Sequence, residues 1–200
     1  MAQLSISCAV AFVLLMKTVP PGAVAESHQE DIVQFWNTSE LIWTTNTTAE
    51  DRRVCKVDMK QNISEKNIIF KRSYLTQAGW IIREYHGVFR NFLNDDNYQM
   101  TSFNAVDIGK KRGHDNATEI LYYQSSDNKC AVFLVLGVDY FSRLPWYEIR
   151  MTDTYIKQGF RMQDECWKQF EEATKGRRRR RAYDSRCQDA LKKRFPSPIP

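Results

Sequence analysis

The run of residues 146–151, Trp-Tyr-Glu-Ile-Arg-Met, contains the side chains best suited to binding a charged ligand. If the run forms a strand, alternation places Trp146, Glu148 and Arg150 on one face. A carboxylate beside an aromatic ring can hold a cationic amine, because the carboxylate offsets the lost hydration and the ring adds a cation–π attraction. Arg150 could instead neutralise Glu148, bind the head group of an anionic lipid, or extend into solvent.

Residues 1–25 have the features of a secretory signal peptide. The stretch 4–16 is apolar, and Ala23-Val24-Ala25 is a small-residue cleavage pattern. The apolar stretch is too short to span a bilayer comfortably. We therefore expect a secreted, extracellular protein whose mature domain covers residues 26–195, followed by a flexible tail over residues 196–200.

The cysteines and the N-glycosylation sequons also fit a secreted, extracellular protein. Once Cys8 is removed with the signal peptide, an even set remains, which predicts two disulfides: Cys55, Cys130, Cys166 and Cys187. They contain no CxxC pair, which argues against zinc, and three pairings are possible. Four N-glycosylation sequons mark positions that we expect to be exposed, beginning at Asn37, Asn46, Asn62 and Asn116.

Positive charge is concentrated in one segment. The chain has a net charge of +5, and the five arginines at 177–181 account for the excess. We expect a solvated loop there, with possible contact to a polyanion through Arg177, Arg178, Arg179, Arg180 and Arg181. A secreted chain whose charge is confined to one loop is not expected to bind nucleic acid or a membrane. We expect a monomer.

Catalytic motifs are absent from the sequence. It contains no HExxH, no GxSxG, no glycine-rich phosphate loop and no CxxC, and its three histidines have no motif context. We therefore predict that the protein is not an enzyme and that it uses no metal or cofactor.

The pattern after the signal peptide indicates an all-β domain. Eight strand-like runs separated by polar or glycine-containing breaks cover residues 41–45, 53–60, 67–75, 80–89, 98–106, 119–124, 130–136 and 146–151. Helical spacing occurs in residues 31–36 and again in residues 159–174. Eight antiparallel strands can form a barrel that holds one small ligand, or a sandwich, and the two helices favour the barrel.

The chain resembles the tick salivary lipocalins of the histamine-binding family. The resemblance is carried by Cys130-Ala-Val132, Glu148-Ile-Arg150 and Cys166, at the family's spacing, and extends over nearly the whole mature chain. It implies an eight-stranded antiparallel lipocalin barrel with a short N-terminal helix and a C-terminal helix packed outside. It also implies the disulfides Cys55–Cys187 and Cys130–Cys166.

The resemblance also implies that Glu148 faces into the barrel. Ala131, Phe133 and Val135 would then share the inner face of the neighbouring strand. The expected ligand contacts are Glu148, Trp146, Phe133, Arg150, Tyr123 and Glu84, although aromatic residues such as Tyr123 more often belong to the core, and Glu84 shares a face with His86 that could be solvated. The chain departs from the family's amine-binding pattern at Ala131, where an acid is usual, and at Arg150, where an aromatic residue is usual.

Three functions follow from these features. The first is sequestration of histamine or another biogenic amine, which the family implies and which would aid evasion of host defence. The second is binding of an eicosanoid or fatty acid, motivated by Ala131 and Arg150. The third is inhibition of complement or coagulation through the outer surface, which the arginine run favours.

Overall fold

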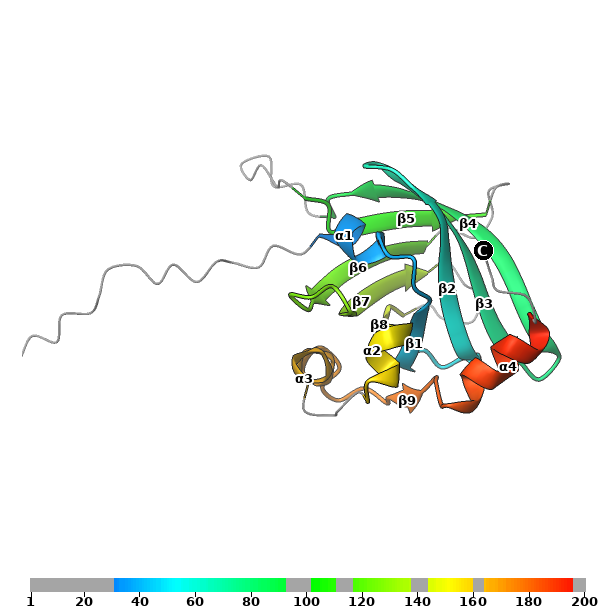
Figure 1. Cartoon of the computed structure of the whole chain (residues 1–200). Coiled ribbons are helices and arrows are strands. Elements are labelled where there is room, and N and C mark those ends of the chain that lie inside the picture. The colour runs from blue at the N-terminus through cyan, green and yellow to red at the C-terminus, as the bar shows by residue number, and fades with distance from the viewer. Residues whose placement is uncertain (1–30, 93–101, 111–116, 138–143, 160–163, 196–200) are drawn as a thin grey trace, which may run out of the picture.

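Eight antiparallel strands close into a barrel (Figure 1). The computed structural model describes residues 31–92, 102–110, 117–137, 144–159 and 164–195; the expected signal peptide, the tail and Asn116 lie outside these ranges. The strands are β1 (Ile42–Thr47), β2 (Val54–Ile63), β3 (Asn67–Thr76), β4 (Gly79–Arg90), β5 (Ala105–Gly109), β6 (Ala117–Gln124), β7 (Cys130–Gly137) and β8 (Trp146–Thr152). Neighbours in sequence pair from β2 to β8, and β1 pairs with both β8 and β2. The predicted barrel is thereby confirmed, and the sandwich is excluded.

The strand positions agree with the sequence pattern. The predicted run over residues 98–106 differs most: its strand is β5, which begins at Ala105, and residues 98–101 lie outside the described ranges. On β8, Ile149 and Met151 pack outside the sheet, whereas Glu148 and Arg150 are buried within the barrel. This is the alternation that the sequence predicts.

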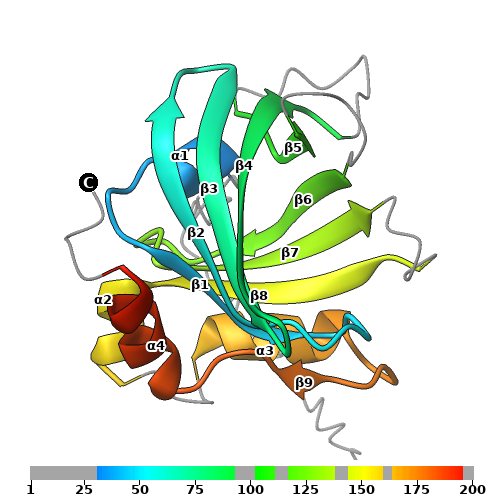
Figure 2. The same ribbon diagram turned by 90° about the vertical axis from the view of Figure 1, so that its right-hand side faces the viewer.

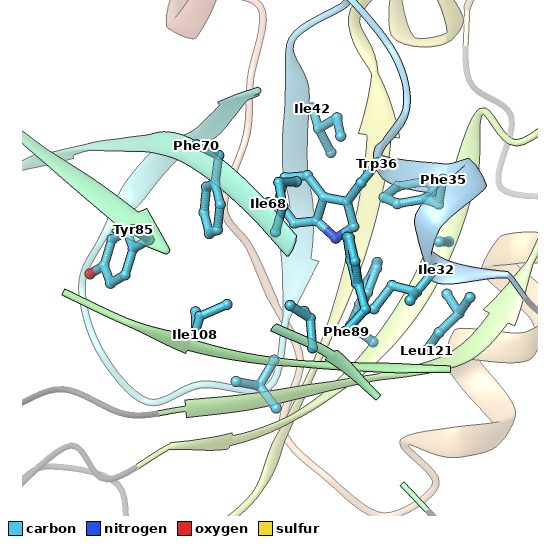
Figure 3. Close-up of a cluster of buried hydrophobic side chains, with 14 of the residues drawn as sticks. Ile32, Phe35, Trp36, Ile42, Ile68, Phe70, Tyr85, Phe89, Ile108 and Leu121 are labelled. Carbon is cyan, nitrogen blue, oxygen red and sulfur yellow. The ribbon is translucent and has the colours of Figure 1, made fainter. Parts of the chain in front are cut away.

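One end of the barrel is filled by a short helix, α1 (Ile32–Trp36). The side chain of Asp31 caps it by accepting hydrogen bonds from the backbone N–H groups of Val33 and Gln34. Its buried face enters the barrel, where the ring of Trp36 lies 4.7 Å from that of Phe70 (Figure 3). This closed end also contains Phe35, Ile68, Phe89 and Leu121. The apolar core therefore occupies the half of the barrel nearest α1.

Three further helices and a short strand cover the outside (Figure 2). They are α2 (Asp153–Lys157), α3 (Glu165–Ala173), β9 (Arg180–Arg181) and α4 (Arg186–Arg194). The apolar face of α3 packs over β7 and β8 through Trp167 and Phe170. We predicted one late helix over residues 159–174; it is shorter, and α2, α4 and β9 were not predicted. Polar and basic residues dominate α4, so its pattern is weak, and packing on Cys187 and Leu191 stabilises it.

Both implied disulfides are present. Cys130–Cys166 joins β7 to α3, and Cys55–Cys187 joins β2 to α4. The two bridges span 36 and 132 residues, so each could contribute about 4 to 5 kcal/mol in the chain-entropy description. Within the described part of the chain, no helix combines the length and apolarity needed to cross a membrane.

The arginine run is solvated for the most part, as predicted, since Arg177, Arg178, Arg179 and Arg181 are exposed, but its end forms a strand and Arg180 turns inward. Arg180 and Arg181 form β9, which pairs with Asn46 and Thr47 of β1. The guanidinium of Arg180 is half-buried, donates to the carbonyl oxygens of Ala49 and Arg53, and forms an ion pair with Asp51 at 2.6 Å. The run is partly ordered because Arg180 satisfies carbonyl groups of the β1–β2 loop that would otherwise lack partners.

Candidate ligand-binding site

Six charged side chains form one network inside the barrel. Three are acidic and three are basic, and they project from four strands: Lys56, Asp58, Arg72, Glu119, Glu148 and Arg150. All are buried except Lys56, whose side chain is 13% exposed. A buried charge is costly unless it is paired and hydrogen-bonded, and the equal numbers of acids and bases meet that condition.

Glu148 lies at the end of the network nearest the open mouth of the barrel. Both of its carboxylate oxygens are 2.7 Å from Nζ of Lys56. Oε2 also accepts from Nε and Nη2 of Arg150, at 3.0 and 2.7 Å, and Oε1 accepts from the indole N–H of Trp146 at 3.0 Å. The inward orientation that the family resemblance implies is therefore observed, but protein donors already occupy this carboxylate.

Arg150 connects Glu148 to the deeper part of the network. Its Nη1 and Nη2 donate to the two oxygens of Glu119, at 2.5 and 2.8 Å. Arg72 donates to Glu119 at 2.8 Å and forms a two-pronged pair with Asp58 at 2.6 and 2.8 Å. Such bidentate contacts are the strong form of the arginine–carboxylate interaction. Arg150 thus neutralises Glu148, one of the roles that we considered from the sequence.

Strand register explains how these residues meet. Asp58 and Arg72 are directly opposite each other on β2 and β3. On β7, Phe133 is opposite Glu148 and Ala131 is opposite Arg150. The guanidinium carbon of Arg150 lies 4.4 Å from the centre of the Phe133 ring. Because Ala131 is small, it leaves room beside Arg150 on the inner face.

The pairing sets the ionisation of the carboxylates. Burial by itself would raise the pKa of Glu119, but Arg150 and Arg72 outweigh it and hold that pKa well below its ordinary value. Burial would likewise raise the pKa of Glu148, and Lys56 and Arg150 lower it instead. Both carboxylates are therefore ionised at neutral pH.

Lys56 is the basic residue of the network whose protonation can change near neutral pH. Burial, reinforced by the positive charge of Arg72, lowers its pKa from 10.5 to about 8 despite the opposing effect of Glu148. Burial also disfavours the charged form of Arg150, but Glu119 and Glu148 raise its pKa above the ordinary value. Near neutral pH, Lys56 can therefore lose its proton at small cost, whereas the arginines remain charged.

A cavity of about 80 Å³ lies between this network and the mouth of the barrel. Its lining combines charged side chains of the network with apolar and aromatic ones that adjoin them: Glu148, Glu119, Lys56 and Arg72, with Tyr85, Ile108, Ala117, Val135 and Trp146. The Trp146 ring lies close to Gly137, where an added Cβ would come within 2.7 Å of the indole Cζ3. The absence of a side chain at Gly137 thus positions the Trp146 ring in the wall.

Further charged residues surround the mouth. Asp51, Arg53, Arg83 and Arg180 line the cavity there, and Arg180 reaches it from β9. Counting all the lining side chains, the cavity has five basic and three acidic residues. The lining therefore has two more basic than acidic side chains.

The structure brings together four of the six ligand contacts that we predicted. Trp146 and Glu148 line the cavity, Arg150 contacts Glu148, and Phe133 lies beneath Arg150. The other two lie elsewhere: Tyr123 packs outside the sheet beside the cluster under α3, and Glu84 is exposed beside His86 on the outer face of β4. Glu84 alternates with the inward Tyr85 on β4 and so points outward. On β6, a bulge between Leu121 and Tyr123 reverses the alternation, so Tyr123 points outward although Leu121 faces the core.

Sequence analysis missed Lys56, Asp58, Arg72 and Glu119. A signal did exist on β3, since Arg72 shares its parity with Phe70, which is buried in the core. Charged residues are usually assigned to the solvated face, so parity alone does not reveal that they point inward. Across the described ranges, no group of three potential metal ligands is assembled.

A closed antiparallel barrel, filled by a helix at one end and hollow toward the other, defines a lipocalin-like ligand-binding protein. The family described as tick histamine binding protein matches residues 25–189, and the chain belongs to that family. No curated protein sequence matches the chain.

Similar solved structures include two lipid- or ligand-binding proteins. Japanin from Rhipicephalus appendiculatus, bound to cholesterol, has a TM-score of 0.46 and 11% identity, covering 75% of this chain and 96% of its own. The siderocalin Ex-FABP, described as functioning through dual ligand specificities, has a TM-score of 0.41 and 5% identity, covering 68% and 81%.

Proposed function

We propose that the protein is a secreted tick salivary lipocalin that sequesters a small host mediator in its barrel and so aids evasion of host defence. The mediator we assign is a biogenic amine such as histamine. The family supports this assignment, and so does the site, since Glu148 and Trp146 both line the cavity. The small cavity also suits an amine better than a long lipid, because aromatic residues fill the barrel's closed end.

The observation that carries the proposal is the contact between Lys56 and Glu148. The ammonium group of Lys56 occupies the position that a ligand ammonium needs, with both carboxylate oxygens in hydrogen-bond range. Because its pKa is lowered to about 8, Lys56 can lose its proton and release Glu148. An incoming amine then replaces one positive charge with another, and the balance of the buried network is preserved.

The aromatic wall supplies the rest of the interaction. Trp146 donates its indole N–H to Glu148, and its ring lies in the wall beside the carboxylate. Tyr85 lines the same cavity. Aromatic faces attract a desolvated cation by roughly 2 kcal/mol, which would add to the attraction of the carboxylate.

A second candidate is a mediator with an acidic group, such as an eicosanoid or fatty acid. The excess of basic side chains around the cavity favours it, since Arg53, Arg83 and Arg180 surround the mouth. Such a ligand would bind with Lys56 protonated and would leave Glu148 in its present contacts. Its hydrocarbon tail would need more room than the cavity now has.

Calorimetric titration separates these candidates. The protein is titrated with histamine, serotonin, a leukotriene and arachidonate at pH 7.5. We expect saturable heat from at least one amine with one ligand per chain. The absence of heat from both amines would contradict the amine assignment, and saturable heat from leukotriene or arachidonate alone would establish the acidic class.

A further inference from the structure

The C-terminal arm, residues 174–195, concentrates positive charge on the outside of the barrel. Of the chain's 29 basic and 24 acidic residues, ten basic and two acidic residues lie in the arm. The remainder of the chain therefore has more acidic than basic residues. We propose that the exposed face of the arm is a docking surface for a linear sulfated polysaccharide, formed by side chains other than Arg180 and Ala182, which line the ligand cavity.

Four side chains in the arm carry this proposal because they are exposed and unpaired. Arg178, Arg181, Lys192 and Lys193 project into solvent, and within the ranges that the structure describes none of them has an ion pair or side-chain hydrogen bond. One of the arm's acids is already neutralised, since Asp184 pairs with Arg186 at 2.8 Å. The unpaired cations are thus available to an external anion.

The arm is held in place, unlike a flexible basic tail. Cys187 is bonded to Cys55, and Ala182 exchanges backbone hydrogen bonds with Thr45 and Cys55 at 2.8 and 2.7 Å. The ring of Tyr183 packs 5.2 Å from that of Trp43. A surface whose charges are fixed before binding loses less conformational entropy when a ligand docks.

The shape of the arm suits an extended partner. In Figures 1 and 2 the chain passes from α3 through β9 to α4 along one side of the barrel. A linear anionic chain can follow such a track and meet several cations in turn. Sulfate groups match the planar donors of arginine, which can contact two oxygens at once.

The arm is less well suited to two other anionic partners, a lipid bilayer and a nucleic acid. The large hydrophobic residues exposed on the described surface, such as Leu144 and Val88, lie outside the arm, so the arm offers no apolar side chain for insertion into a bilayer. Tyr183 is buried and cannot stack on nucleic-acid bases. The arm's attraction to an anion is therefore electrostatic, as sulfated sugars require.

Immobilised heparin tests the proposal. The arm variant Arg178→Gln, Arg181→Gln, Lys192→Gln, Lys193→Gln removes four charges that make no described contact. The control, Lys60→Gln, Lys66→Gln, Lys71→Gln, Lys129→Gln, is matched in charge and removes four lysines from β2, β3, the turn between them, and the β6–β7 turn. Two of these lysines have exposed partners, Asn37 for Lys60 and Asp127 for Lys129. Thermal unfolding and ligand titration of each variant verify the fold.

We expect wild type and control to remain bound at 150 mM salt and the arm variant to lose roughly tenfold or more in affinity, with a shallower salt dependence. Flow-through of wild type at that salt, or elution of the arm variant together with wild type, would overturn the proposal. So would retention on desulfated heparin, or tighter binding to phosphatidylserine vesicles than to heparin.

Discussion

Lys56 and Glu148 face each other inside the barrel, with the lysine Nζ 2.7 Å from each carboxylate oxygen. They belong to β2 and β8, the two strands that flank β1. The pair therefore spans the position at which the barrel closes. An internal ammonium group thus contacts the carboxylate that would anchor an amine, and under the proposed function the ligand amine would replace it.

The first prediction concerns the carboxylate. Replacing Glu148 with Gln should weaken amine binding by about 2 to 5 kcal/mol, because the ligand's desolvated charge would lose its partner. Glu84→Gln is the matched control, since Glu84 is an exposed carboxylate on the outer face of β4. Calorimetric affinities of the two variants provide the measurement. Equal affinities would show that the amine is anchored elsewhere.

The second prediction concerns the contribution of the buried charge network to the free energy of unfolding. Arg150→Met leaves Glu119 without one of its two arginine partners, and loss of a buried partner typically costs about 3 to 5 kcal/mol. The double variant Arg150→Met, Glu119→Gln should cost less than the sum of the two single changes. Urea unfolding measures all three. Additive single effects would mean that the pair is not coupled.

Acid should destabilise the protein through the same carboxylates. Arginine and lysine partners hold the folded-state pKa values of Glu119 and Glu148 below the ordinary value of 4.5. Their stabilising effect is therefore fully present above about pH 4.5 and is lost as the pH falls below it, where the unfolded chain binds more protons. Urea unfolding between pH 3 and 6 should show a steeper loss for wild type than for Glu119→Gln. Parallel profiles would contradict this assignment.

The sequons should differ in occupancy. Asn37 and Asn62 are exposed near the end of the barrel that α1 fills. Asn46 is half-buried on β1 between β8 and β9, and the hydroxyl of Thr48, in the same sequon, accepts a hydrogen bond from the Tyr147 N–H at 2.9 Å. A glycan at Asn46 would compete with the pairing of β9.

We therefore expect Asn37→Gln and Asn62→Gln each to remove one glycan from the secreted protein. Asn46→Gln should leave its mass after expression unchanged apart from the substitution. Mass spectrometry before and after enzymatic deglycosylation provides the measurement. A glycan lost on Asn46→Gln would show that β9 tolerates, or is displaced by, the sugar.

The barrel could be predicted from the sequence because the patterns that indicate its strands lie within short segments of the chain. Alternating apolar residues, turn residues and cysteines of even number each act over short segments, and the strands follow them closely. The disulfide pairing came from the family pattern, because cysteine spacing alone leaves three choices. By contrast, α4 and β9 depend on docking against β1 and β2, which no local pattern encodes.

The site was predictable on β8 and on the neighbouring β7, where Phe133 and Val135 face inward as expected. Alternation grouped Trp146, Glu148 and Arg150 correctly. The partners of Arg150 come from residues such as Glu119, 31 positions away, and their pairing depends on the register of the closed sheet. The two departures from the family pattern prove to be neighbours, since Ala131 is opposite Arg150.

Proton release on amine binding is the most direct test of whether the ligand amine replaces the Lys56 ammonium at Glu148. Histamine and serotonin are titrated at pH 7.5 in phosphate and in Tris, whose ionisation enthalpies differ, so that the difference in heat gives the number of protons transferred. The Lys56→Met variant serves as the control, because it has no proton to release at that position.

With its pKa lowered to about 8, Lys56 is about three-quarters protonated at pH 7.5, so wild type should release roughly three-quarters of a proton per amine bound. Lys56→Met should bind the amine at least as tightly and release none from this site. Binding without proton release in wild type, or equal release in both proteins, would contradict the replacement of Lys56 by the ligand at Glu148.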